Sequence, residues 1–155
     1  MRLRLIAALV AGIIAGVVIQ AVAFGGTAAK LRKPVTVHVI EHARSDTVID
    51  TGKAGDTTGD LLTFHNPVFD AADATRAGRD QGQCIRIVAG ASWECTWTTF
   101  LPGGHITVEG PFFDTRDSVV AVTGGTGIYR NARGAMLLES RAGGTKFDFV
   151  FRLVP

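Results

Sequence analysis

The residues of this chain best placed for chemistry include its only two cysteines, Cys84 and Cys95. Residues 83–88 and 91–100 have the character of two strands, and a two-residue turn at Ala89-Gly90 places Cys84 opposite Cys95 on one face of a hairpin. An even cysteine count in an exported chain favours a disulfide, and the alternative is a free Cys84 thiol that lines a pocket. The spacing matches no zinc motif, so we expect no metal site.

Two tryptophans lie on the same face of this hairpin as the cysteines. Trp93 and Trp97 are in phase with Cys95, and Arg86 falls opposite Trp93. The arrangement is typical either of core packing with one cation–π contact or of an aromatic lining for an apolar ligand. The sequence leaves both interpretations open.

Glu41 sits at the end of the apolar strand that is predicted to start at Val35. An inward-pointing carboxylate at that position is costly without a partner, and at the mouth of a barrel it is a candidate for function. An outward-pointing one is an ordinary solvated side chain. The sequence does not decide between these orientations.

Other patterns favour structural roles. Histidines 38, 42, 65 and 105 are spread over different strands or strand ends, and we expect each to be exposed or hydrogen-bonded rather than a ligand. The glycines of 123–127 follow a strand, but no helix follows them to hold a phosphate, so a tight turn is expected. No nucleophile-elbow motif is present, and no cofactor is expected.

The elements that carry these residues are strands. No long helical period follows residue 30, and residues 70–80 are expected to form a surface loop with at most one helical turn. Pro67 is expected to end the second strong strand, because proline cannot donate to a ladder. The predicted strands are 35 to about 42, a short one at 47–49 within the loop 43–60, 59–65, 83–88, 91–100, 105–109, 118–123, 135–140 and 146–153. Such an all-β chain needs a sandwich or a closed barrel to cover its edges and its apolar face.

Residues 1–29 differ in kind from this domain. Arg2 and Arg4 precede fifteen apolar residues at 5–19, and Ala21-Val22-Ala23 predicts signal-peptide cleavage before Phe24. The alternative is an uncleaved membrane anchor, since the apolar stretch is about 20 residues long. We therefore assign 1–29 as a signal peptide or anchor with a tether, and 30–155 as the folded domain. Both interpretations place that domain outside the cytoplasm.

The charge balance excludes one class of partner. Loss of residues 1–23 removes two of the sixteen basic residues and none of the fourteen acidic ones, so the mature chain has a formal charge of zero. The domain contains no basic run with interleaved aromatic residues. We expect no nucleic-acid partner, and membrane contact only through an uncleaved N-terminal segment.

Several ordered motifs carry a resemblance to a known family. They are GDLLTFHN at 59–66, GQC at 82–84, GHITVEGPF at 104–112, VTGGTG at 122–127 and NARG at 131–134. Together they resemble the allene oxide cyclase family, whose wider relatives include dirigent proteins. The resemblance implies an eight-stranded antiparallel barrel with a hydrophobic cavity, commonly assembled as a homotrimer.

The resemblance also assigns candidate residues. Glu41 corresponds to a glutamate near the reacting end of the substrate, and Asn66 to an asparagine that holds a water molecule. Phe64 corresponds to the aromatic beside that asparagine, and Cys84 to a cysteine of the cavity. Cys95 has no counterpart in the family.

These observations predict an exported barrel that binds a hydrophobic, lipid-like or polyketide-like molecule, with Glu41 and Asn66 as catalytic candidates of a cyclase or isomerase. Phe64, Cys84, Trp93 and Trp97 are the ligand-binding candidates. Two alternatives stay open: a non-catalytic carrier of dirigent or lipocalin type, and a structural surface domain with a packed core.

Overall fold

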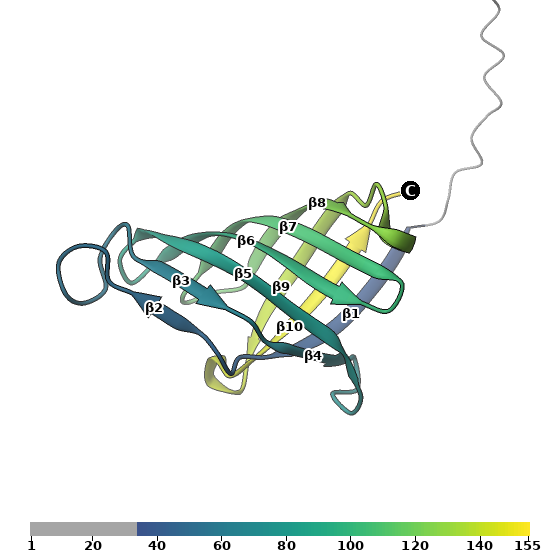
Figure 1. Ribbon diagram of the computed structural model, residues 1–155, viewed down its shortest axis with the longest axis horizontal. Coiled ribbons are helices and arrows are strands. Elements are labelled where there is room, and N and C mark those ends of the chain that lie inside the picture. Colours follow the sequence, from purple (N-terminus) through teal and green to yellow (C-terminus); the bar gives the residue numbers. More distant parts are fainter. Residues whose placement is uncertain (1–33) are drawn as a thin grey trace, which may run out of the picture. The chain divides into compact units, whose positions relative to one another are not determined.

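The computed structural model describes residues 34–155, which form a closed antiparallel β-barrel (Figure 1). Its elements are β1 (Val35–His42), β2 (Thr47–Ile49), β3 (Leu61–Phe64), β4 (Pro67–Asp70), β5 (Arg76–Val88), β6 (Ser92–Leu101), β7 (Gly104–Phe113), β8 (Ser118–Gly125), β9 (Gly134–Arg141), β10 (Lys146–Leu153) and the 3₁₀ turns η1 (Gly127–Tyr129) and η2 (Ala142–Gly144). Within 34–155 no helix is long and apolar enough to cross a membrane. The predicted N-terminal helix, signal or anchor lies outside the described residues.

Closure follows from the strand order. Consecutive pairing runs from β5 through β6, β7, β8, β9 and β10 to β1, and β4 then joins β1 back to β5. The strands β3 and β4 pair with successive parts of β5 and together form one side of the barrel, while β2 lies on the other edge of β3. The barrel is therefore eight-stranded, as predicted.

Strict alternation explains how β10 builds the interior. Phe149, Phe151 and Leu153 are buried on one face, as the sequence pattern predicts. The opposite face carries Asp148, whose side chain is nevertheless only 2% exposed. It is covered because His38 and the Arg141 guanidinium both bind its carboxylate.

The segment 65–80 differs from expectation in two ways. The second strong strand stops before Pro67 as predicted, since β3 ends at Phe64, but Pro67 also begins the unpredicted strand β4, because the first residue of a strand needs no donated ladder hydrogen bond. The segment 70–80 is not a surface loop: β5 already begins at Arg76, and only 71–75 form the turn. Polar, Ala-rich composition hid this strand, whose ladder partners lie far away in the sequence.

The β5–β6 hairpin has the predicted register but a different turn. Cys84 lies opposite Cys95 and Arg86 opposite Trp93, as predicted. A register shift follows Arg86, and the loop then spans 89–91 rather than two residues. Gly90 has a φ of 67°, which glycine adopts without the steric penalty of a side chain.

Candidate functional site

The candidate site is an apolar cavity of about 130 Å³ inside the barrel. It lies towards the end where β1 finishes and β10 begins, whereas residues such as Met136, Val108 and Phe151 pack the rest of the interior. A dry cavity of about 150 Å³ is large enough for benzene. The enclosed space therefore fits one ring, and a larger ligand would extend out of the mouth. Its aromatic wall residues are Phe64, Trp97, Phe112, Phe147 and Phe149.

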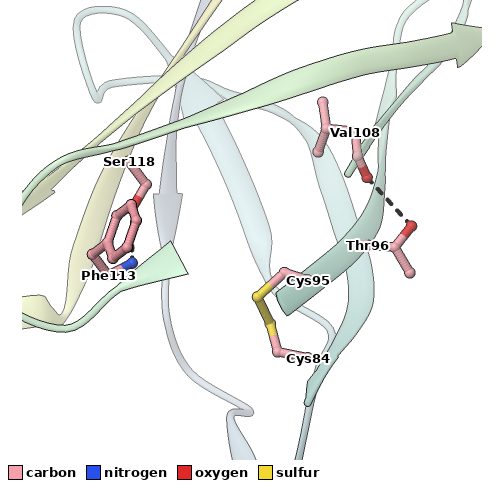
Figure 2. Close-up of a disulfide and its surroundings, with 6 residues drawn as sticks. All are labelled: Cys84, Cys95, Thr96, Val108, Phe113 and Ser118. Atoms are coloured by element: carbon pink, nitrogen blue, oxygen red, sulfur yellow. Dashed lines mark hydrogen bonds between the residues drawn. A yellow bond between two sulfur atoms is a disulfide. The ribbon is translucent and has the colours of Figure 1, made fainter. Parts of the chain in front are cut away.

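The disulfide forms part of this wall. Cys84 and Cys95 are joined across β5 and β6, with 4.0 Å between their Cα atoms, and both line the cavity (Figure 2). The predicted bridge is confirmed, and the alternative of a free Cys84 thiol is wrong. The neighbouring Thr96 is exposed, and its hydroxyl donates to the Val108 carbonyl of β7 (3.3 Å). The cystine thus fixes two adjoining strands of the wall.

The structure separates the two tryptophans. Trp97 lines the cavity, where its ring centroid lies 5.7 Å from that of Phe149. Trp93 lies outside the cavity, with the Arg86 guanidinium 3.8 Å from its ring centroid. The predicted cation–π contact is therefore present, and of the two predicted ligand-binding tryptophans only Trp97 reaches the cavity.

Arg86 also forms ion pairs with the loops that carry Asp56 and Asp114 at this end of the barrel. Its Nε lies 2.6 Å from the Asp56 carboxylate, and its Nη1 donates to Asp114 at 2.6 Å. Asp56 belongs to the loop before β3, which buried Asp60 organises by accepting the Thr57 N–H. The hydrogen bond from the Thr57 backbone holds the pKa of Asp60 below its ordinary value.

Glu41 points into the cavity and is 5% exposed. The sequence had left its orientation open. Its Oε1 accepts a hydrogen bond from the Asn66 side-chain amide at 2.7 Å. Burial, followed by repulsion from the Asp80 and Asp46 carboxylates, raises the pKa of Glu41 well above its ordinary value.

Asn66 is buried in the gap between β3 and β4, where it organises the acidic groups. The two Nδ2 hydrogens reach Glu41 and Asp46, each over 2.7 Å, while Oδ1 accepts from the Arg44 and Ser45 backbone N–H groups. An amide side chain has two donors and two acceptor positions. Asn66 has no remaining donor for a water molecule, so its geometry suits positioning of Glu41.

Asp80 completes an acidic cluster with Glu41 and Asp46. One of its carboxylate oxygens, Oδ1, accepts the Asn66 backbone N–H at 3.0 Å. No N–H or neutral hydroxyl donor of the described chain reaches the other oxygen, Oδ2. Burial raises the pKa of Asp80 to about 7, and a protonated Glu41 can donate a hydrogen bond to it. Burial and the neighbouring carboxylates therefore favour the protonated form of Glu41.

Sequence reasoning missed Asp46 and Asp80, because both were assigned to loops. Asp46 lies just before β2, and Asp80 lies within β5. A usable signal existed for Asp80: it is in phase with Cys84 and Arg86, which marks the inner face of a strand continued backwards from residue 83.

The histidines take no part in this site. His38 binds Asp148 and His42 binds Asp73, both pairs on the outer face of the barrel and both at 2.5 Å. Within residues 34–155, no group of three or more His, Cys, Asp or Glu side chains is arranged to hold a metal ion.

Comparison with known proteins gives one family and several related folds. The family model for allene oxide cyclase matches residues 30–154. A solved pyocyanin demethylase is 26% identical, with a TM-score of 0.65 over 74% of this chain and 98% of its own. A pterocarpan synthase dirigent protein is 17% identical, with a TM-score of 0.67 over 81% and 97%. The Diels-Alderase AbmU of Streptomyces koyangensis is also 17% identical, with a TM-score of 0.61 over 83% and 72%.

Proposed function

The chain belongs to the allene oxide cyclase family, and from that premise we propose that its barrel binds a ring-forming or ring-bearing apolar molecule and isomerises or cyclises it by acid catalysis. One observation carries the proposal: the Glu41 carboxyl faces an apolar cavity while Asn66 and Asp80 hold it from behind. A carboxylic acid kept neutral in such a place is a proton donor at neutral pH.

The proposed chemistry needs no co-reactant. Glu41 donates its proton to a substrate oxygen on which negative charge develops as bonds rearrange within the substrate. When Asp80 is protonated, it can donate a hydrogen bond to the resulting Glu41 carboxylate and so stabilise it. The product returns the proton to Glu41, so the enzyme ends the cycle in its starting state. A positioned general acid accelerates such a step by about 10²- to 10⁴-fold.

The cavity contributes orientation. Its volume of about 130 Å³ leaves one ring little freedom, and the aromatic walls restrict the orientations that the ring can adopt. Fold relatives described as Diels-Alderases and a dirigent protein support a role in ring closure or in the control of its geometry. We also propose that the protein acts outside the cytoplasm, on the basis of residues 1–23.

A non-catalytic carrier is the second candidate. Asn66 uses its whole amide within the protein, so it offers no donor for the ordered water that the family resemblance implies. A carrier needs the apolar cavity but no proton donor. The same cavity argues against the third alternative, a barrel with a fully packed core.

Recovery of the bound molecule tests these candidates. The purified protein is extracted and the extract is analysed by mass spectrometry, and the recovered molecule is then assayed for conversion. We expect Glu41→Gln to bind it within about threefold of the wild type and to lose at least about 10²-fold in turnover. Glu109→Gln makes the same chemical change at an exposed position and should behave as wild type. Binding without turnover in the wild type would establish a carrier, and an empty extract would favour the structural domain.

A further inference from the structure

The cavity combines an aromatic wall with acidic groups. Phe64, Trp97 and Phe149 lie next to one another around it. The ring centroids of Phe64 and Trp97 are 6.2 Å apart, and those of Trp97 and Phe149 are 5.7 Å apart. Phe112 and Phe147 form a second pair at 6.0 Å. The face of an aromatic ring carries partial negative charge and attracts cations, most strongly where water is excluded.

The charges that face this wall are all acidic. Glu41 and Asp46 line the cavity and Asp80 lies behind Glu41, whereas the part of the chain that the structure describes contributes no lysine, arginine or histidine to the lining. None of the ion pairs formed within residues 34–155 includes these three carboxyls. Arg44 donates its backbone N–H to Asn66, and it takes part in none of these ion pairs.

Other buried acids of the barrel are compensated. Asp148 is bound by His38 and by the Arg141 guanidinium, and Asp60 accepts backbone N–H groups. By contrast, Asp80 is fully buried, and no N–H donor among the described residues reaches its Oδ2. Burial of an uncompensated carboxylate is expensive, and either a bound proton or a cation removes the cost. A bound cation can therefore take the place of a proton here.

We propose that the cavity selects a planar aromatic cation, or a ring that becomes cationic during reaction, over neutral and anionic molecules of the same shape. This inference rests on the proposed function, because it names the class of molecule that the same cavity takes. The ring lies among the aromatic walls with its positive charge towards Glu41 and Asp46. A molecule that presents a carboxylate to this end is rejected, because it would meet three carboxyl groups and no cation.

Three probes of nearly equal size test the selectivity: N-methylpyridinium, toluene and benzoate. Each fits the one-ring volume of the cavity, and they carry charges of +1, 0 and −1. Binding to the purified protein is followed by calorimetry and by NMR shifts of the Trp97 indole. At pH 8 we expect N-methylpyridinium to bind at least tenfold more tightly than toluene, and benzoate not to bind.

The pH dependence of binding distinguishes recognition of the ligand's charge from recognition of its shape. Glu41 on β1, Asp46 before β2 and Asp80 on β5 are the titratable groups of the cluster. Burial raises the pKa of Asp80 to about 7, so this group gains negative charge as the pH rises from 6 to 8. N-methylpyridinium should therefore bind more tightly at pH 8 than at pH 6, while toluene changes little.

Variants complete the test. Asp80→Asn should reduce the preference for the cation at pH 8 to less than threefold, and Asp46→Asn should reduce it partially. Glu109→Gln should leave it unchanged. If toluene binds as tightly as N-methylpyridinium, or benzoate binds, the inference is overturned while the apolar site of the proposed function stands. If no probe binds, both are overturned.

Discussion

Glu41, Asn66 and Asp80 come from three separate strands or strand ends and form one hydrogen-bonded unit. Asn66 is central because its side chain binds Glu41 while its backbone N–H binds Asp80. A side chain with both donors and acceptors can hold two acidic groups close together, which a purely apolar neighbour could not do. The chemistry of the site is thus decided by one amide and by the lack of a basic side chain beside it among residues 34–155.

The elevated pKa of Asp80 predicts how stability depends on pH. Its value of about 7 in the folded chain exceeds the ordinary 3.8, so the folded state binds this proton more tightly than the unfolded state does. The associated stability is complete below pH 3.8 and is lost as the pH rises through 7. At about 1.4 kcal/mol for each pKa unit, the loss is at most about 4 kcal/mol. The raised pKa of Glu41 acts in the same direction.

Urea unfolding at pH 4.5 and pH 7.5 measures this loss. The free energy of unfolding of the wild type should be larger at pH 4.5, and Asp80→Asn should reduce the difference because it removes the titrating group. Asp60, Asp70 and Asp73 have lowered pKa values, so their contribution changes below this pH window. An equal pH difference in both proteins would contradict the assignment of the shift to Asp80.

At the scale of elements, the β5–β6 hairpin holds the cavity wall. It carries the cystine, and Gly82 lies opposite Trp97. A Cβ atom at Gly82 would lie 2.2 Å from the Trp97 Cβ, so only glycine lets the two strands approach closely here. The break between β3 and β4 serves the same site, since it turns Asn66 towards Glu41.

Removal of the disulfide should weaken the barrel without unfolding it. In the chain-entropy account, closing a loop of this length stabilises by roughly 3 kcal/mol, and less if the reduced hairpin persists. We expect Cys84→Ala/Cys95→Ala to lose up to that amount in urea unfolding. Reduced wild type should match the variant, and a reductant should not affect the variant. A variant as stable as oxidised wild type would refute the stabilising role.

At the scale of the whole molecule, closure of the barrel allows one end to stay hollow. Every strand of the closed ring has a hydrogen-bonded neighbour on both sides, so the cavity does not expose an unpaired ladder. Buried side chains such as Ile106, Val120 and Met136 fill the rest of the interior. Core and cavity therefore share one set of strands.

Export is a prediction about the whole chain. If residues 1–23 are a cleaved signal, the protein recovered outside the cytoplasm should begin at Phe24 and contain no free thiol. N-terminal sequencing and thiol titration of that fraction provide the measurement. A chain that keeps residues 1–23 and sediments with membranes would instead support the anchor. A cytoplasmic chain with two free thiols would refute both.

The sequence by itself determined the strands with clear alternation, the all-β class and the register that pairs Cys84 with Cys95. Those features depend on local periodicity and on one short turn, which neighbouring residues specify. It did not reveal β4, the early start of β5, or the direction of Glu41. Asp46 and Asp80 joined the site only through contacts between segments far apart in the chain. Their pKa values and pairing depend on burial and on partners that only the closed barrel brings together.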